Sequence, residues 1–280
     1  MEIKIGQYNT MRVVKTLDFG IYLDGGEMGE ILMPTKWVPQ GTQPEDKLEV
    51  FIYFDSEDRP IATTTKPKAM VGEFAWLKAK AVDRIGAFLD WGLDKDLLVP
   101  FKEQNAKMEE GRCYLVYLYV DPRTKRIAAS AKVEKFLDIE PADYSPGQEV
   151  ELMIWTRSDM GYKTIINQKH QGLLYANEIF QDLRPGQKLK GYISQVRPDG
   201  KIDLKLQKSG YKNVIDDFSH KILQSLKENE GFLPITDKSS PEDIYQTLQM
   251  SKKNFKKAVG ALYRQRLISI TEMGIGLVTS

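Results

Sequence analysis

Basic side chains recur at regular spacing along the middle of the chain. Lys78, Lys80 and Arg84 alternate with apolar residues, which places their charges on one face of a β-strand. Two comparable groups follow in the sequence: Arg123, Arg126 and Lys132, then Arg197, Lys201 and Lys205. Cations in such rows can hold the phosphates of a nucleic acid strand. A solvated sheet face or hairpin has the same pattern, so both interpretations stay open.

A second kind of basic segment lies near the C-terminus. Residues 250–266 contain six basic side chains and no acidic one. Within this segment, Lys253, Lys257 and Arg264 lie on the side of a predicted helix opposite its apolar stripe. These three residues are candidates for contact with nucleic acid. The alternative is a solvated basic face on a purely structural helix.

The sequence lacks the residue sets that catalyse reactions or hold metals. His170 and His220 are fifty residues apart, and neither has a Cys or His partner at metal-ligand spacing. The carboxylates around residues 83–96 do not obviously converge on an ion, as metal-dependent cleavage of nucleic acid would require. There is no glycine-rich phosphate loop and no Ser/His/Asp set. We therefore expect no enzymatic activity, no metal and no cofactor.

An internal repeat defines the elements that carry these side chains. Residues 50–55 (VFIYFD) return, position by position, as residues 116–121 (VYLYVD). A polar turn and a second strand follow each copy, at residues 60–66 and 126–132. An apolar stretch bent at a glycine, and a short strand ending in proline, precede each copy. Each unit therefore contains short strands with period-two alternation, glycine at the bends and proline at a strand end.

A third and more diverged copy of the unit runs from Gly147 to Lys208. Five short strands in about 65 residues, with no helix-length amphipathic run between the first three, are typical of a small Greek-key barrel of the OB type. We therefore predict a mainly β fold with an α-helical C-terminal domain. The three tandem five-stranded barrels are expected at residues 1–65, 66–146 and 147–210.

The hydrophobic period changes in the last seventy residues. Apolar residues recurring at intervals of three and four residues predict a helix that ends near Gly231. Ser240 supplies an N-cap for a short helix that begins at Pro241, and Ser251 can cap a third helix. A closing hairpin follows. This order predicts a winged helix-turn-helix domain at residues 211–280, whose third helix can enter a major groove.

Composition and charge limit the class of protein. No uncharged apolar run approaches the roughly 20 residues of a membrane helix. We therefore expect a soluble, cytoplasmic protein with no membrane partner. Residues 1–65 carry 6 basic and 11 acidic side chains, whereas residues 147–280 carry 20 basic and 15 acidic ones. A surface that attracts polyanions is thus expected in the C-terminal half or in the second unit.

The single cysteine, Cys113, excludes an intramolecular disulfide. It lies in a strand of alternating polarity, which predicts a small buried residue rather than a reactive thiol.

The second unit resembles the S1 RNA-binding domain, a five-stranded OB fold. The resemblance is carried by residues 83–89 (DRIGAFL), 96–99 (DLLV) and 126–130 (RIAAS), in that order. It implies that two aromatic residues around the bend, and a histidine after the third strand, form a platform on which bases stack. The matching aromatic residues are Phe19 and Tyr22 in the first unit and Phe88 in the second, where Ile85 takes the first place. In the third unit Tyr162 lies one step off, beside Met160, and the histidine position of the three units holds Met33, Val99 and Tyr175.

Three such units followed by a winged helix resemble the conserved virulence factor B family of bacterial RNA-binding proteins, over essentially all 280 residues. The domain order carries this resemblance more specifically than any single motif. It implies a non-enzymatic, virulence-associated protein whose S1-like barrels contact single-stranded RNA. Such a protein is expected to regulate gene expression after transcription.

Two other functions stay open from the sequence. The winged helix favours a DNA-binding regulator whose third helix reads a duplex. The acidic first unit and the missing histidines favour a protein-interaction scaffold bound to the ribosome or to RNA polymerase.

Overall fold

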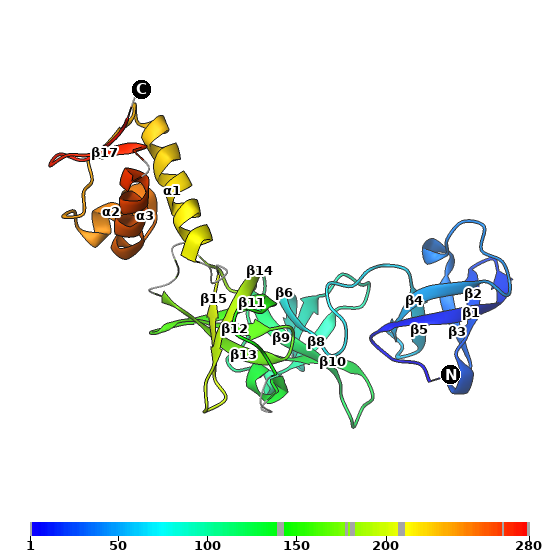
Figure 1. Ribbon diagram of the computed structural model, residues 1–280. Helices are drawn as coiled ribbons and strands as arrows, with labels where there is room; N and C mark the ends of the chain where they lie inside the picture. The colour runs from blue at the N-terminus through cyan, green and yellow to red at the C-terminus, as the bar shows by residue number, and fades with distance from the viewer. Residues whose placement is uncertain are drawn as a thin grey trace. The chain divides into compact units, whose positions relative to one another are not determined.

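The computed structural model describes residues 2–138, 143–176, 179, 183–206, 211–264 and 266–278, with side chains from residue 217 onward in the first helix. The chain divides into two compact units, residues 1–137 and 138–280 (Figure 1). The fold is mainly β with a helical C-terminal domain, as the sequence predicts. None of the helices in the described ranges is long and apolar enough to cross a membrane.

The first barrel is closed, with strand order β1-β2-β3-β5-β4. Its strands are β1 (Tyr8–Leu17), β2 (Gly20–Asp24), β3 (Glu30–Pro34), β4 (Lys47–Phe54) and β5 (Pro60–Thr63), with 3₁₀ turns η1 (Gly26–Met28) and η2 (Thr35–Trp37). Along β1, Met11 and Val13 are buried while their neighbours Thr10 and Arg12 are exposed. This alternation directs one side of each strand into the barrel core.

The second barrel repeats this arrangement with one difference. Its strands are β6 (Phe74–Asp83), β7 (Gly86–Asp90), β8 (Leu97–Pro100), β9 (Cys113–Val120) and β10 (Ile127–Ser130), with 3₁₀ turns η3 (Phe101–Glu103) and η4 (Val133–Phe136). The sheet order is β10-β9-β6-β7-β8. Strands β8 and β10 lie side by side. They form no ladder within residues 74–130, all of which are described, whereas the corresponding strands β3 and β5 pair in parallel.

The third barrel is closed again, in the order β11-β12-β13-β15-β14. Its strands are β11 (Glu149–Ser158), β12 (Gly161–Ile166), β13 (His170–Tyr175), β14 (Lys188–Val196) and β15 (Ile202–Lys205). Its core contains Val150, Leu152, Ile154, Ile193 and Leu204. The diverged third copy therefore has the same topology as the first.

The C-terminal domain has the predicted winged helix elements. They are α1 (Tyr211–Glu228), β16 (Phe232–Leu233), α2 (Pro241–Leu248), α3 (Lys252–Arg264), β17 (Ile268–Ile270) and β18 (Ile275–Leu277). Ser240 forms a capping box with Asp243 at the start of α2, which satisfies backbone groups that the helix leaves unpaired. Strand β16, which pairs with β18, was not predicted, because two residues are too few to show a period.

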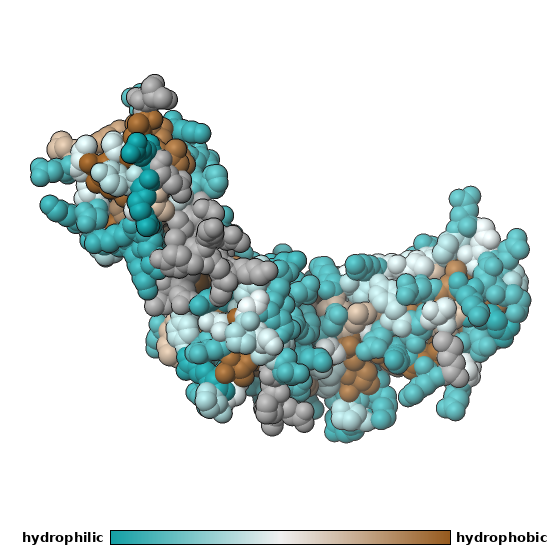
Figure 2. Space-filling model, viewed as in Figure 1, coloured by the Kyte–Doolittle hydropathy of each residue, from teal (hydrophilic) through white to brown (hydrophobic). Residues whose placement is uncertain are grey.

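A glycine occupies the same tight bend in all three barrels. A Cβ atom at Gly20, Gly86 or Gly161 would lie only 2.3, 2.2 or 2.0 Å from a carbonyl oxygen of the facing strand. Any larger residue would separate the two strands. The residue before each glycine projects outward, because Phe19, Ile85 and Met160 are 57%, 57% and 62% exposed. The face of the molecule seen in Figure 2 is mostly hydrophilic, with scattered apolar patches.

Cys113 is exposed, so the prediction that it is buried is wrong. It is the first residue of β9, and its register partner on β6 is Lys78, which is also exposed. The alternation of β9 therefore begins on the outer face, and burial starts at Leu115.

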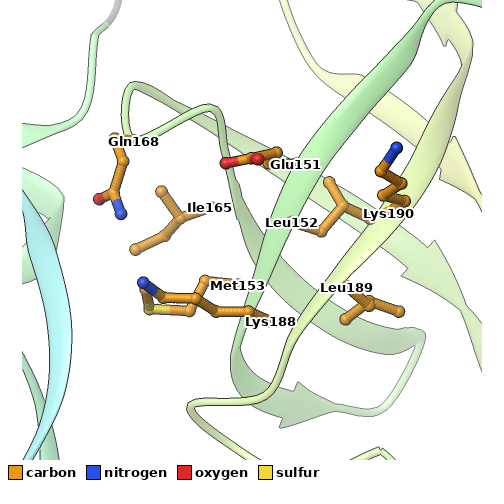
Figure 3. Close-up of a pocket in the computed structure, with 8 residues that line it drawn as sticks. All are labelled: Glu151, Leu152, Met153, Ile165, Gln168, Lys188, Leu189 and Lys190. Atoms are coloured by element: carbon orange, nitrogen blue, oxygen red, sulfur yellow. The ribbon is translucent and has the colours of Figure 1, made fainter.

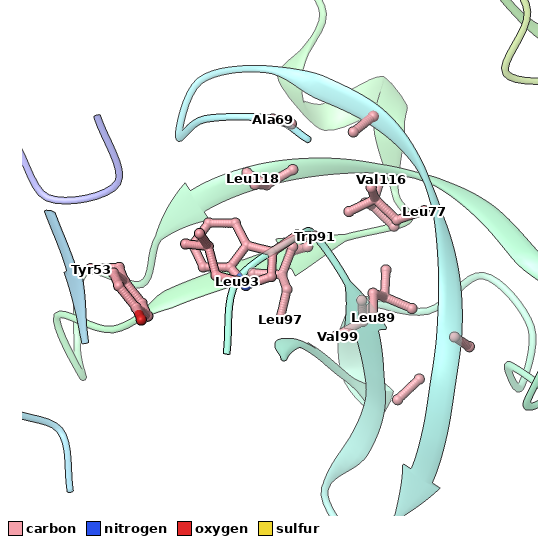
Figure 4. Close-up of a cluster of buried hydrophobic side chains, with 14 of the residues drawn as sticks. Tyr53, Ala69, Leu77, Leu89, Trp91, Leu93, Leu97, Val99, Val116 and Leu118 are labelled. Carbon is pink, nitrogen blue, oxygen red and sulfur yellow. The ribbon is translucent and has the colours of Figure 1, made fainter. Parts of the chain in front are cut away.

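The first two barrels share one hydrophobic core inside the unit of residues 1–137. Phe51 and Tyr53 of β4 pack their rings against Trp91, which follows β7, at centroid distances of 5.9 and 6.3 Å. Figure 4 shows Tyr53 beside Trp91, with Leu93 and Leu97 close by. Burial, together with the carboxylates of Asp94 and Asp55, raises the pKa of Tyr53 to about 12. The two sequence repeats thus fold into one compact unit.

Charged side chains reinforce this junction at its edge. Lys95 donates hydrogen bonds to the carboxylate of Asp58 at 3.0 Å and to the carbonyl of Asp55 at 2.6 Å. Arg126 also pairs with Asp58, and Lys36 pairs with Asp94. The β4–β5 turn of the first barrel is therefore attached to the second barrel at several points.

We expect Trp91→Ala to lower the free energy of unfolding by about 3–5 kcal/mol, because truncating a buried Trp leaves a cavity. Trp76→Ala is the matched control in the same unit, since Trp76 is 37% exposed; its effect should be about 1 kcal/mol or less. Urea denaturation of the full chain, followed by far-ultraviolet circular dichroism, measures both. Equal effects of the two substitutions would contradict a shared core at Trp91.

Candidate nucleic-acid interface

The two aromatic residues predicted in the first barrel lie next to each other. Phe19 is at the β1–β2 bend and Tyr22 is half-buried on β2; their rings meet edge to face, with centroids 6.4 Å apart. The ammonium group of Lys15 lies 4.6 Å from the centroid of the Tyr22 ring. An exposed ring beside a second ring and a cation is a suitable platform for an unstacked base.

The cations around this platform are already paired with acidic residues. Lys15 pairs with Glu30 at 2.5 Å, and Arg59 pairs with Asp55 at 2.8 Å. Arg12 bridges Asp24 and Glu45 at 3.0 and 2.7 Å; these are its only charged partners among the described residues. The acidic composition of the first unit thus neutralises its own basic groups. The first barrel offers ring faces more than free positive charge.

In the second barrel, the predicted residues Phe88, Arg123 and Arg126 line one groove of about 470 Å³. Phe88 is half-buried on β7, opposite Leu98 of β8, and the exposed Ile85 lies at the rim. Residues of the first barrel's β4–β5 turn, including Asp58, also line this groove. The structure therefore brings together aromatic and cationic candidates that are 35 to 38 residues apart in sequence.

The remaining basic candidates of the second barrel lie outside the groove. Lys78 and Lys80 are exposed on the outer face of β6, as their alternation predicts, and Arg84 is exposed at the β6–β7 bend. Lys80 pairs with Asp96 at 2.9 Å, and this hydrogen bond raises the pKa of Lys80. Within the described part of the chain, Lys78, Arg84 and the half-buried Lys132 have no acidic partner within 4.0 Å. These three cations are available to phosphates.

The acidic residues around 83–96 pair with separate lysines rather than converging. Asp90 pairs with Lys68 at 2.5 Å, and Asp96 pairs with Lys80. No group of three His, Cys, Asp or Glu side chains in the described ranges is placed to hold a metal ion.

In the third barrel, Tyr162 is buried in the core at 8% exposure, so it offers little ring surface for stacking. The strand register explains the difference. Tyr22 and Phe88 lie two residues after the bend glycine and pair with Leu32 and Leu98 of the next strand. In the third barrel, the residue two positions after the bend glycine is Lys163, which pairs with Leu173. The stacking position is thus occupied by Lys163, whose ammonium lies 5.4 Å from the ring of Trp155. Alignment on the bend glycines would have identified it.

The predicted histidine position is also shifted by one residue in the first two barrels. Met33 and Val99 are fully buried in their cores. Tyr175 pairs with the bend glycine Gly161, and the residues in the same register are Pro34 and Pro100. Equating Met33 and Val99 with Tyr175 was therefore wrong. A shift of one residue along a strand moves a side chain to the opposite face.

Tyr175 and Arg197 meet in a hydrogen-bonded cluster around a buried carboxylate. Tyr175 donates to Asp203 at 3.2 Å, and Arg197 donates to Asp203 at 2.8 Å and to the Tyr175 hydroxyl. Gln195 donates to the same carboxylate at 2.7 Å. Burial alone would raise the pKa of Asp203, but hydrogen bonds from Arg197 and Gln195 lower it overall. Arg197 is thus held by Asp203 and is not a freely placed phosphate ligand.

The other two basic candidates of the third barrel are Lys201, just before β15, and Lys205, at its end. Lys201 is exposed in the β14–β15 turn and pairs with Asp199 at 2.9 Å. Lys205 is half-buried at the end of β15, opposite Tyr192. A separate hollow of about 250 Å³ on this barrel, lined by Glu151, Lys188 and Lys190 among others, contains none of the predicted residues (Figure 3).

The candidate contacts of the winged helix lie on one side of α3. Lys253, Lys257 and Arg264 are all exposed, while Phe255, Val259 and Leu262 form the buried stripe, as predicted. Four lysines stand in the first six residues of α3, and its first turn has no acidic residue. Cations at this end oppose the helix dipole by about 0.3–1 kcal/mol each at low salt. A bound anion there would relieve that repulsion.

Comparison with known proteins identifies two of the domains. Residues 220–277 match the model of the CvfB-like winged helix domain, and residues 5–65 match that of the S1 domain. Conserved virulence factor B of Staphylococcus haemolyticus is 26% identical over 98% of this chain and 94% of its own length. The resemblance to the conserved virulence factor B family is confirmed.

Other relatives also match this chain over most of its length. Conserved virulence factor B of Staphylococcus aureus is 28% identical over 83% of this chain and 82% of its own length. A Bacillus subtilis protein named uncharacterized protein YitL is 27% identical over 92% and 89%. A solved structure of a multidomain protein with nucleic acid binding domains from Streptococcus pneumoniae covers 98% of both chains at 23% identity, with a TM-score of 0.44.

S1 and winged helix domains are of nucleic-acid-binding types, so nucleic acid is the general class of partner that the domains of this chain indicate. The conserved virulence factor B name further associates the family with virulence.

We expect Asp203→Asn to lower the free energy of unfolding by about 1–3 kcal/mol at pH 7, because the cluster loses its charged acceptor. The pKa of Asp203 is lowered in the folded protein. The carboxylate therefore stabilises the fold fully at pH values above the pKa of Asp in the unfolded chain, about 3.9. This stabilisation is lost as the pH falls below that pKa. The difference from wild type should therefore shrink toward pH 3. Urea denaturation at several pH values measures it.

Asp199→Asn is the control for this prediction, because Asp199 forms an exposed pair with Lys201 in the same barrel. Its effect should stay within about 0.5 kcal/mol. An Asp203→Asn effect that does not change with pH would show that the carboxylate charge is unimportant.

Proposed function

We propose that this protein binds single-stranded RNA, catalyses no reaction on it, and regulates gene expression after transcription. The observation that carries this proposal is the repeated β-hairpin bend, which presents Phe19 and Tyr22 in the first barrel and Ile85 and Phe88 in the second. The same bend carries the stacking residues in S1 domains, as the resemblance implies.

A single-stranded ligand fits this arrangement better than a duplex. Ring faces can stack only on bases that are not already stacked in a helix, and each such contact contributes roughly 1–3 kcal/mol. Sequence-specific binding of RNA also relies mainly on unpaired bases. The first two barrels present separate ring surfaces, which suits a flexible strand.

The three barrels are expected to contribute unequally. The first has the more exposed rings but few unpaired cations. The second combines Phe88 with the free cations Lys78, Arg84 and Lys132 and should supply most of the affinity. In the third, Tyr175 is fixed by its hydrogen bond to Asp203, and Lys201 and Lys205 supply charge. Regulation connected with virulence is proposed from the names of the relatives.

We expect labelled single-stranded RNA to bind saturably at low salt, with a dissociation constant that rises as salt is added, since phosphate contacts release counterions. Phe19→Ala combined with Phe88→Ala should weaken binding at least fivefold, because two stacking contacts are lost. Fluorescence anisotropy at two salt concentrations measures both effects.

Phe232→Ala is the control for the stacking variants, because Phe232 is 43% exposed but lies in the winged helix domain. It should leave the dissociation constant unchanged. The absence of saturable binding at low salt would refute the RNA proposal and favour a protein-interaction scaffold on the ribosome or polymerase.

The lysines at the start of α3 favour a second function, the binding of duplex DNA by the winged helix. Changing Lys253, Lys257 and Arg264 to Glu should weaken duplex binding at least tenfold. It should also reduce the slope of the logarithm of the binding constant against the logarithm of the salt concentration, by the amount expected for about three phosphate contacts. Lys221→Glu with Lys227→Glu provides a control, because both residues are exposed on α1 of the same domain. Electrophoretic mobility shifts with duplex and single-stranded probes distinguish the two functions. Equal losses for the two sets of variants would argue against a specific role of α3.

A further inference from the structure

We propose that the groove between the first and second barrels holds one unstacked nucleotide of the RNA strand, so that both barrels form one composite site. This inference rests on the proposed RNA-binding function and specifies where one nucleotide lies. The groove belongs entirely to the unit of residues 1–137, and its volume is about 470 Å³. That volume is within the range of roughly 300–1,000 Å³ usual for small-ligand sites.

The walls of the groove are held in a fixed relation to each other. The first barrel contributes Phe54, Ser56 and Asp58, which lie at the end of β4 and in the turn after it. Asp58 is bound by both Lys95 and Arg126 of the second barrel, and Trp91 packs into the shared core beneath. A site assembled in advance does not lose binding free energy to ordering its two halves.

The groove also lies where the second barrel departs from the other two. Its lining includes Leu98 and Pro100 of β8 together with Ile127 and Ala128 of β10. These are the strands that form no ladder, whereas β3 pairs with β5 and β13 with β15 in the other barrels. Backbone groups along an unladdered edge can accept or donate hydrogen bonds to a ligand such as a base edge.

The charges in the groove fit a nucleotide. Its three carboxylates are satisfied within the protein: Asp58 by Lys95 and Arg126, Asp96 by Lys80, and Asp121 by backbone amides of its own turn at 2.9 Å. Of the four cations that line it, Lys95 and Arg126 are the partners of Asp58.

Lys102 and Arg123 are the other two cations. Hydrogen bonds from backbone amides, together with the charge of Lys102, lower the pKa of Asp121 in the same lining. Neither Lys102 nor Arg123 has an acidic partner within 4.0 Å among the described residues. They stand beside the apolar surface formed by Phe88 and Ile85. An apolar surface with two available cations at its edge matches a base stacked on Phe88 and a phosphate held by Lys102 and Arg123.

Photocrosslinking tests this inference directly on the full wild-type chain. Single-stranded RNA containing 4-thiouridine is irradiated with the protein, and the crosslinked peptides are identified by mass spectrometry. Crosslinks to both residues 54–58 and residues 85–88 would support the composite site. Crosslinks confined to one barrel would overturn it while leaving RNA binding intact. Absence of any RNA binding would instead refute the proposed function itself.

A matched pair of charge reversals gives a second readout. Arg123→Glu should weaken RNA binding at least fivefold and lower the salt slope by about one contact. Lys125→Glu changes an exposed cation in the same turn that does not line the groove, so it should have a smaller effect. Equal effects of the two variants would contradict a phosphate position at Arg123. Phe54→Ala should also weaken binding, because it removes part of the wall supplied by the first barrel.

Discussion

The packing of Trp91 against Phe51 and Tyr53 joins two barrels that the sequence presents as separate repeats. An indole buried at 3% exposure removes a large apolar area from water, and the ion pairs around Asp58 limit rotation about that contact. Because the two barrels share a core, residues of the turn between β4 and β5 line one groove together with residues of β8 and β10. The groove with the most candidate residues exists only because of this contact.

The three barrels share a backbone constraint but differ in the chemistry they present. The bend glycines allow two strands to approach too closely for any Cβ atom, so the preceding residue always projects outward. In the first barrel the projecting residue is aromatic and the nearby cations are neutralised. In the second it is aliphatic, but free cations and Phe88 are available. In the third it is Met160, Lys163 occupies the position of Tyr22 and Phe88, and Tyr175 is fixed by Asp203. The three barrels thus share one scaffold and differ in the side chains at its surface.

The C-terminal domain shows a conflict between stability and charge. Its capping box at Ser240 and its buried stripe on α3 stabilise the helices in the usual way. The lysines at the start of α3 act in the opposite sense, because they face the positive end of the helix dipole. Two of these lysines have partners within the domain, because Lys252 donates to the carbonyl of Ser239 at 2.8 Å and Lys256 lies 3.8 Å from Asp237.

Period-two alternation, bend glycines and helix caps by themselves determined the three barrels and the winged helix, because each is a local rule about which face is buried or which backbone group is capped. Only the tertiary structure decided that Tyr162, Met33 and Val99 face the barrel cores, since a one-residue shift reverses the face of a strand. It also decided which cations are free. Lys80 and Arg197 are paired with Asp96 and Asp203 through the folding of separate strands. The junction at Trp91 was likewise decided only by the tertiary structure. Trp91 is buried because the two barrels contact each other, and the alternation of polar and apolar residues within one repeat does not show that contact.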